Sequence, residues 1–139
     1  MIRVLLADDH KIISSALQYL LEAQGDIEVV AIAADGQEAV EKARKECPDV
    51  VIMDISMPRL DGIAATRQLC ECCPKTRVVM LTMYETTQHV QGALQAGAHG
   101  YVLKDSAGQE LVDAVRTIYK GGSYFSSAIV KAGFRFLDP

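Results

Sequence analysis

The stretch "IRVLLADDH", residues 2–10, joins a run of apolar residues directly to two adjacent carboxylates, Asp8 and Asp9. Residues 50–58, "VVIMDISMP", repeat this pattern with a single carboxylate, Asp54. A continuous apolar run is typical of a strand that is buried on both faces, as in a parallel sheet covered by helices. Both stretches therefore predict buried parallel strands that end in negative charge.

Similar apolar runs recur along the chain. Five strands are predicted, at residues 2–7, 27–34, 50–53, 77–82 and 100–103. Apolar residues at helical spacing lie between them, for example over residues 13–21 and 111–119. An alternation of strands and helices is typical of a doubly wound α/β protein, so we expect a (βα)5 architecture around a parallel sheet.

Residue types at the predicted helix boundaries support this division. Asp35 and Ser106 each stand three residues before Glu or Gln, which is the capping-box spacing that begins a helix. Glycines stand where the first, fourth and fifth helices are expected to end, at Gly25, Gly97 and Gly121. Residues 122–139 fit the scheme less well, and a last helical turn, the start of a linker and vector-derived sequence all remain open.

The composition indicates one ordinary globular domain. The chain has 139 residues, of which 50% are hydrophobic and 23% are charged. Its formal net charge of −4 makes it a poor binder of nucleic acid by itself. No apolar stretch approaches the ~18 residues that a membrane helix needs, and the first residues lack the features of a secretory signal. We therefore expect a cytoplasmic protein that has no membrane partner.

Three of the four cysteines lie in "LCECCP", residues 69–74. Such a cluster could serve metal or redox chemistry, but it lacks the paired C-x₂-C spacing of zinc sites. We predict instead that Cys70 and Cys73 are small apolar residues that face the core from a helix.

Polar residues follow four of the predicted strands at the same end. Asp8 and Asp9 follow the first strand, and Asp54 follows the third. Thr82 is the last residue of the fourth strand, and Lys104 follows the fifth. Each residue taken singly is explained as a helix cap or a solvated loop residue. Five such residues at one end are better explained by a ligand, because ligands of open α/β sheets bind outside the carboxyl ends of the strands.

Electrostatics indicates which ligand this is. Two like charges ~4 Å apart repel by about 4 kcal/mol at an effective dielectric near 20, which is a large part of a domain's stability of ~5 to 15 kcal/mol. A cation relieves this repulsion, and oxygen ligands favour Mg²⁺ or Mn²⁺. A carboxylate can also act as a nucleophile that forms an aspartyl phosphate. Mg²⁺ and Lys104 would then neutralise the transferred phosphoryl group, and Thr82 could hydrogen-bond it.

Four motifs of the chain resemble the receiver domains of two-component response regulators: "LLADDH", "VVIMDISMPRLDG", "VVMLTMYE" and "GAHGYVLKD". The resemblance covers residues 1–121, and "LLADDH" with "YVLKDS" is similar to the NarL/FixJ-type subgroup, whose receivers precede a LuxR-type helix-turn-helix. It implies a flavodoxin-like, CheY-like three-layer sandwich with a five-stranded parallel sheet in the order 2-1-3-4-5. Residues 122–139 would then be a last helical turn or the start of a linker to a DNA-binding domain outside this chain.

The resemblance also implies a role for each acidic residue. Asp54 would accept a phosphoryl group from the phosphohistidine of a sensor histidine kinase. Asp9 would bind Mg²⁺ directly and Asp8 mainly through water. The backbone carbonyl of Ser56 and the carboxylate of Asp54 would complete the protein ligands of the metal.

The remaining site residues would read out the phosphorylated state. Lys104 would hold a phosphoryl oxygen. Thr82 and Tyr101 would form a switch pair, in which the hydroxyl moves toward the phosphoryl group and the ring turns inward. The resemblance thus implies a signalling switch rather than an enzyme, with a phosphorylation-dependent homodimer and transcription as the output, DNA being bound only by the absent domain.

Two positions depart from the pattern of many receivers. Asp105 follows Lys104 where many relatives have proline after a cis peptide, so a cis bond is not expected here. Met83 follows Thr82 where many relatives have a smaller residue, and we hypothesise that it crowds the phosphoryl pocket.

Three other functions are alternatives to a switch that controls transcription. A stand-alone receiver would act only by binding a partner. A Mg²⁺-dependent phosphohydrolase of the haloacid dehalogenase type would use Asp54 as its nucleophile, but the second acid expected two residues later is replaced by Ser56. A dinucleotide-binding domain is disfavoured because no G-x-G-x-x-G follows the first strand.

Overall fold

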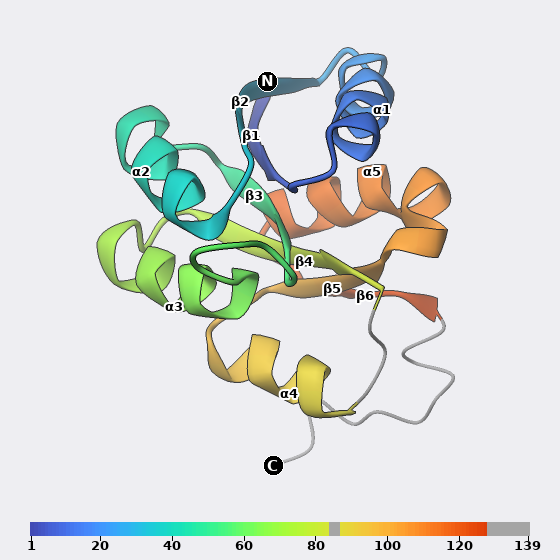
Figure 1. Ribbon diagram of the computed structural model, residues 1–139. Helices are drawn as coiled ribbons and strands as arrows, with labels where there is room; N and C mark the ends of the chain where they lie inside the picture. The colour runs from blue at the N-terminus through green and yellow to red at the C-terminus, as the bar shows by residue number, and fades with distance from the viewer. Residues whose placement is uncertain (84–86, 128–139) are drawn as a thin grey trace.

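A parallel sheet forms the centre of the molecule, with its strands in the order β2-β1-β3-β4-β5-β6 (Figure 1). The computed structural model describes residues 1–83 and 87–127, and all counts of elements refer to these ranges. The strands are β1 (Ile2–Ala7), β2 (Ile27–Ala33), β3 (Val50–Asp54), β4 (Arg77–Thr82), β5 (Gly100–Leu103) and β6 (Tyr124–Phe125). The predicted strands agree with β1–β5 to within one residue at each end.

Helices cover both faces of the sheet, as predicted for a three-layer sandwich (Figure 1). They are α1 (Lys11–Glu22), α2 (Gly36–Glu46), α3 (Gly62–Cys72), α4 (Thr87–Gln95) and α5 (Ala107–Tyr119), with a 3₁₀ turn over Lys104–Ser106. Buried residues of α2, α3 and α4 belong to one apolar cluster, and those of α1 and α5 belong to another. None of the described helices is long and apolar enough to span a membrane.

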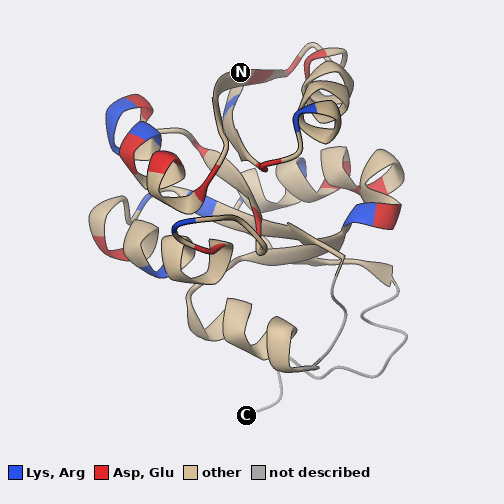
Figure 2. Ribbon diagram, in the orientation of Figure 1, with Lys and Arg blue, Asp and Glu red and all other residues tan. Residues whose placement is uncertain are grey.

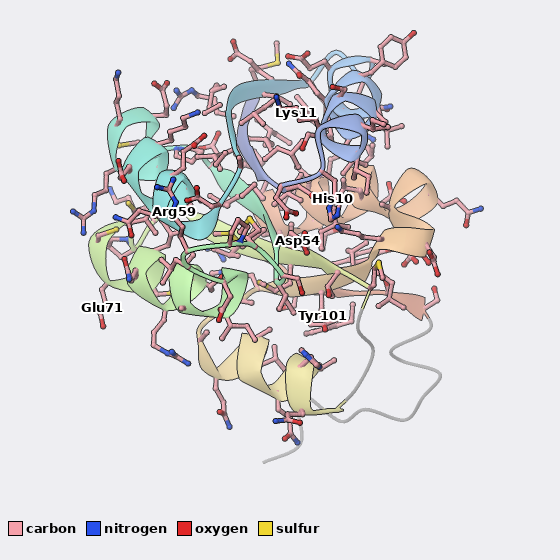
Figure 3. The ribbon with its side chains drawn as sticks, in the orientation of Figure 1. His10, Lys11, Asp54, Arg59, Glu71 and Tyr101 are labelled. Atoms are coloured by element: carbon pink, nitrogen blue, oxygen red, sulfur yellow. The ribbon has the colours of Figure 1, made fainter. Side chains whose placement is uncertain are left out.

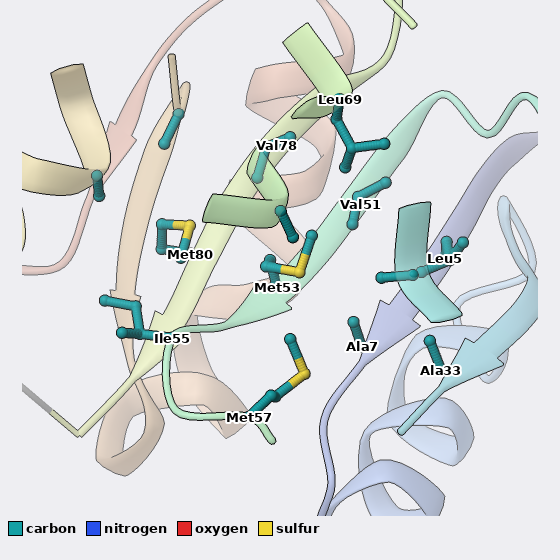
Figure 4. Close-up of a cluster of buried hydrophobic side chains, with 14 of the residues drawn as sticks. Leu5, Ala7, Ala33, Val51, Met53, Ile55, Met57, Leu69, Val78 and Met80 are labelled. Atoms are coloured by element: carbon teal, nitrogen blue, oxygen red, sulfur yellow. The ribbon is translucent and has the colours of Figure 1, made fainter. Parts of the chain in front are cut away.

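Successive residues of the central strands point to opposite faces, which explains their unbroken apolar sequence. In β3, Val51 and Met53 pack into the α2–α3–α4 cluster, whereas Val50 and Ile52 pack into the α1–α5 cluster. All four are fully buried. Figure 4 shows part of the first cluster, in which side chains from β1, β3 and β4 meet Leu69 of α3. The sheet is therefore held from both sides, so its strand ends are fixed in position.

The expectation of a five-stranded sheet is incomplete, because β6 adds a sixth strand beside β5. Tyr124 and Phe125 pair with Gly100 and Tyr101 in parallel register. Beyond the pair, the Ser126 N–H donates to the Tyr101 carbonyl over 2.9 Å. A strand of two residues carries too little periodicity to be predicted from sequence. The rest of the predicted tail, residues 128–139, lies outside the described residues.

The helix boundaries test the capping predictions one by one. Asp35 caps α2 as predicted, since its Oδ1 accepts a hydrogen bond from the Glu38 N–H over 2.8 Å. Ser106 is the N-cap residue of α5, as its spacing predicts, but residues 104–106 form the 3₁₀ turn and the Ser106 side chain makes no capping hydrogen bond. The glycines expected at helix ends do have positive φ, with 85° for Gly25, 105° for Gly97 and 102° for Gly121.

Candidate functional site

The parallel register brings the predicted site residues to one edge of the sheet. Ala7, which precedes Asp8, pairs with Met53, which precedes Asp54. On the other side of β3, Thr82 is the last residue of β4 and pairs with Leu103 of β5, directly before Lys104. The convergence predicted from the strand ends is therefore observed.

Lys104 bridges the two buried carboxylates of this edge. Its Nζ lies 3.1 Å from Oδ2 of Asp54 and 3.1 Å from Oδ2 of Asp8. Asp8 and Asp54 are each 3% exposed, and the Lys104 side chain is 11% exposed. One positive charge thus faces two negative charges where water screens them little.

The pKa shifts follow from this imbalance. Burial raises the pKa of Asp54, and the charge of Asp8 acts in the same direction, while Lys104 opposes both. Burial by itself would lower the pKa of Lys104, but the two carboxylates outweigh it and raise that pKa, so the lysine stays charged. The ionised form of Asp54 is therefore under-compensated in this fold.

A third carboxylate and an imidazole complete the cluster. Ligand atoms of Asp8, Asp9, His10 and Asp54 all lie within 4.8 Å of one another. Nδ1 of His10 is 3.0 Å from Oδ1 of Asp8 and 3.1 Å from Oδ1 of Asp9. The backbone N–H of His10 also donates to Asp8 Oδ1 over 2.8 Å. Figure 3 shows His10, before α1, and Asp54, at the end of β3, at the same edge of the sheet.

Sequence reasoning missed this role of His10. It is the N-cap residue of α1. Its side chain, however, turns back to the acidic pair instead of standing alone in a loop. The only sequence signal was its adjacency to Asp8 and Asp9, and an N-cap residue that lacks a side-chain capping bond is free to orient this way.

The residues present fit a hard divalent cation. Oδ2 of Asp8 is buried and forms an ion pair with Lys104 Nζ over 3.1 Å, but it accepts no well-aligned hydrogen bond from the part of the chain that the structure describes. Buried carboxylate oxygens are hydrogen-bonded or coordinate metals, and the ion pair with Lys104 leaves a surplus of negative charge. Oxygen donors from three carboxylates suit Mg²⁺ or Mn²⁺. The imidazole of His10 lies in the same cluster.

Ser56 lies in the loop directly after Asp54. Its backbone N–H donates to Oδ1 of Asp54 over 3.3 Å, so this loop already contacts the central carboxylate. The metal-binding role of the Ser56 carbonyl stays a prediction. Asp61, at the end of the same loop, is the N-cap residue of α3, and its Oδ1 accepts a hydrogen bond from the Ala64 N–H over 2.8 Å.

Close backbone packing explains the glycine of the "RLDG" motif. A Cβ atom on Gly62 would lie 2.0 Å from the carbonyl oxygen of Asp54, which no side chain can tolerate. The Gly62 N–H also donates to the carbonyl of Ile55 over 2.8 Å. The loop thus folds tightly against the residue that carries the site, and any substitution of Gly62 would displace it.

Thr82 and Tyr101 lie on the neighbouring strands β4 and β5, and both are fully buried (Figure 3). Burial raises the pKa of Tyr101 far above its usual range, while a hydrogen bond with the Thr82 side chain acts in the opposite direction. The phenol is therefore neutral and contacts Thr82. The role of this pair as a switch stays a prediction.

The structure describes both positions that depart from the family pattern, Asp105 and Met83. Every peptide bond that the structure describes is trans, including the one between Lys104 and Asp105. The Met83 side chain is 73% exposed, so most of its surface faces solvent. Its predicted effect on the phosphoryl pocket remains a hypothesis.

Comparison with known proteins agrees with this geometry. The family model described as "Response regulator receiver domain" matches residues 4–116. The oxygen regulatory protein NreC of Staphylococcus haemolyticus is 43% identical over 123 residues, covering 88% of this chain and 57% of that protein. The chain therefore spans little more than half the length of this curated relative.

Solved structures are similar over most of the chain. A LuxR-family two-component response regulator from Aurantimonas sp. SI85-9A1 has a TM-score of 0.89 at 37% identity, covering 93% of this chain and 92% of that one. The receiver domain of the response regulator NarL from Mycobacterium tuberculosis has a TM-score of 0.83 at 35% identity, covering 86% and 97%. Together with the family match, this shows that the chain belongs to the response regulator receiver domains.

Proposed function

We propose that the chain is a phosphorylation-activated switch in which Asp54 accepts a phosphoryl group. The observation that carries this proposal is the arrangement of one lysine between two buried carboxylates, Asp8 and Asp54, with a third at Asp9. Such a site is short of positive charge, so it favours a divalent cation. A trigonal phosphoryl group in transfer needs the same compensation by a cation and a lysine.

The residues divide the chemistry among them. A carboxylate oxygen of Asp54 attacks the phosphorus of a phosphohistidine, the P–N bond breaks as the P–O bond forms, and the imidazole leaves as the neutral ring after taking up a proton. Mg²⁺ held by Asp8, Asp9, Asp54 and the Ser56 carbonyl would offset the charge on the phosphoryl oxygens. Lys104 already contacts Asp54 and would exchange this contact for a phosphoryl oxygen.

The readout would run through Thr82 and Tyr101. A phosphoryl group on Asp54 would attract the Thr82 hydroxyl, and the space left beside Thr82 would hold the Tyr101 ring inward. Both changes would shift an existing equilibrium between two conformations of the protein. The surface beyond them consists of α4, β5 and α5. Helix α4 carries no Lys, Arg, Asp or Glu (Figure 2), so contacts of this helix with a partner would depend on packing and amide groups.

The wider assignments rest on the family and on similarity to longer proteins. We propose a sensor histidine kinase as the phosphodonor, a homodimer as the phosphorylated form, and a cytoplasmic location. Residues 1–121 would form the receiver, to which β6 adds Tyr124 and Phe125, and residues after them would lead to a helix-turn-helix domain that regulates transcription. A stand-alone receiver is the alternative, and the reading frame beyond residue 139 distinguishes the two.

Phosphotransfer to Asp54 can be tested by intact-protein mass spectrometry. The protein is incubated with a small phosphodonor such as acetyl phosphate and Mg²⁺, and we expect a gain of one phosphoryl group. Asp54→Asn should show no gain, whereas Asp49→Asn, which changes the carboxylate at the other end of β3, should behave as the wild type. A phosphoryl group on another residue, or none at all, would contradict the proposal. Turnover of a generic phosphomonoester would favour the phosphohydrolase instead.

A further inference from the structure

A second feature lies at the opposite end of the sheet from the acidic cluster. A cavity of about 760 Å³ opens between the turn that follows α2 and the turn that follows α3. Three of the four cysteines, Cys47, Cys72 and Cys73, line this cavity. The other lining residues lie on the same two turns or beside them: Arg44, Pro48, Asp49, Pro74, Lys75 and Thr76. Two segments far apart in sequence therefore bring thiols to one opening.

Two of the sulfur atoms lie near the separation of metal ligands. Sγ of Cys72 lies 3.4 Å from Sγ of Cys73. Two thiolates bound tetrahedrally to one ion at about 2.3 Å each lie roughly 3.8 Å apart, so this pair would have to separate only slightly to share an ion. Both residues are partly exposed and line the cavity, so an ion can reach them from solvent.

The third thiol belongs to Cys47, which is exposed at the C-cap of α2. Its φ of 48° places it in the left-handed region, where glycine or asparagine is usual. It lines the same cavity as Cys72 and Cys73. Burial, followed by the neighbouring Cys72, raises the pKa of the Cys73 thiol to about 11. A residue other than glycine in the left-handed region costs conformational energy, and such positions are often functional.

The third sulfur must move to complete a site. In the described part of the chain, the acidic cluster is the only set of three or more potential ligands that lie within 4.8 Å of each other. Sγ of Cys47 is instead 3.7 Å from the carbonyl oxygen of Arg44. Because Cys47 is exposed, rotation about its Cα–Cβ bond can exchange this weak contact for a bond to an ion.

We propose that Cys47, Cys72 and Cys73 bind a soft, thiophilic cation at this end of the sheet. Sulfur-only donors select such ions over Mg²⁺, which prefers oxygen. Each thiol releases its proton as the sulfur–metal bond forms, and the guanidinium of Arg44, which lines the same cavity and whose pKa is raised by Cys72, would offset part of the thiolate charge. The soft site and the acidic site would thus take different metals at opposite ends of β3.

Cys70 provides a matched control, because it lies in the same cysteine-rich segment but outside the cavity. Its Sγ is 3.4 Å from the carbonyl oxygen of Ala96 and 3.8 Å from that of Gly97, beside the end of α4. The prediction that Cys70 and Cys73 both face the core is confirmed for Cys73, which packs against the α2–α3–α4 cluster and also lines the cavity. Cys70 instead packs toward the end of α4.

The proposal can be tested by titrating the reduced protein with Cd²⁺ in the presence of excess Mg²⁺, which occupies the acidic site. We expect an ultraviolet sulfur-to-cadmium charge-transfer band that saturates at one equivalent. Cys72→Ser and Cys73→Ser should each weaken Cd²⁺ binding at least tenfold and lower the band by the share of one sulfur in three. Cys70→Ser should leave both the band and the affinity unchanged.

Cys47→Gly sharpens the test, because it removes a sulfur while placing the preferred residue at the left-handed position, so the fold should not suffer. We expect a weaker and smaller band with thermal stability unchanged or raised. The proposal is overturned if Cys47→Gly keeps the full band, if Cys70→Ser loses as much as Cys72→Ser, or if the wild type shows no saturable band. None of these outcomes depends on phosphorylation of Asp54.

Discussion

Strand β3 has a carboxylate at each end, and the two are treated in opposite ways. Asp49, directly before the strand, is half-buried, and its Oδ2 accepts a hydrogen bond from the Arg3 N–H over 2.9 Å. Its backbone also bonds to Arg3 and Arg77 on the neighbouring strands. Asp54, at the other end, is buried beside another carboxylate and forms an ion pair with the ammonium group of Lys104.

This difference separates structural from functional charge. The carboxylate of Asp49 is satisfied by an adjacent backbone group that the fold itself supplies, so it can stabilise the sheet. The carboxylate of Asp54 is stabilised by groups that can be exchanged for a metal ion or a phosphoryl group. Sites of this second kind commonly reduce stability in favour of activity, which makes the contrast between the two ends measurable.

The largest effect is expected from removing the shared lysine. Lys104→Met leaves Asp8 and Asp54 buried without a counter-charge, which should lower the free energy of unfolding by about 3 kcal/mol in the absence of Mg²⁺. Urea denaturation measures this loss, and saturating Mg²⁺ should recover part of it. Lys120→Met, on the exposed end of α5, should change stability by less than about 0.5 kcal/mol. Equal effects of the two variants would refute the central role of Lys104.

A smaller loss of stability is expected at the structural end. Asp49→Ala leaves the Arg3 N–H without its acceptor, so it should destabilise the protein by about 1 to 2 kcal/mol. Phosphorylation by acetyl phosphate should proceed in this variant at the wild-type rate, as measured by mass spectrometry under conditions where the variant is folded. A large drop in that rate would mean that the two ends of β3 are coupled and would weaken the comparison.

The smallest effect should be a gain, and it should depend on pH. The pKa of Asp54 is raised in the folded protein, so the folded state binds its proton more tightly than the unfolded state does. The free energy of unfolding of the wild type therefore falls as the pH rises above the ordinary value of 3.8. Asp54→Asn lacks this loss and should be more stable by about 1 kcal/mol near pH 7.

The same variant should differ little from the wild type once the pH is low enough to protonate Asp54 in both states. Thermal denaturation from acidic to neutral pH without Mg²⁺ measures this difference. A gap between the two proteins that stays constant with pH would show that the effect comes from packing and not from ionisation. A gap that closes toward neutral pH would contradict the sign derived from the raised pKa.

The sequence predicts most of the fold and the site because both follow from simple patterns. Strands buried on both faces have unbroken apolar sequences, as in β3, and parallel strands bring their carboxyl ends together. Asp8, Asp54, Thr82 and Lys104 were predicted to meet on that basis alone. Their hydrogen bonds and charge balance then followed from the burial that the structure provides.

The remaining features depend on tertiary contacts that leave little trace in sequence. His10 joins the acidic cluster because its side chain turns back on the chain, and β6 exists because β5 offers an open edge. At Ser106, a 3₁₀ turn precedes the helix, and the N-cap residue makes no side-chain capping hydrogen bond although its sequence spacing looked suitable. The cavity beside Cys47 forms only when α2 and α3 end side by side, so spacing within "LCECCP" could not reveal it.

Strand β6 also determines where the chain leaves the receiver. Ser126 is fully buried, and its Oγ accepts a hydrogen bond from the Leu103 N–H over 2.9 Å, one residue before Lys104. Tyr124 is held as well, because its hydroxyl donates to Oε1 of Glu110 over 2.9 Å. The chain is therefore fixed to the sheet at Ser126, beyond the end of α5. Because effective concentration depends on where a tether is attached as well as on its length, this attachment would influence how closely a segment tethered here approaches Asp54.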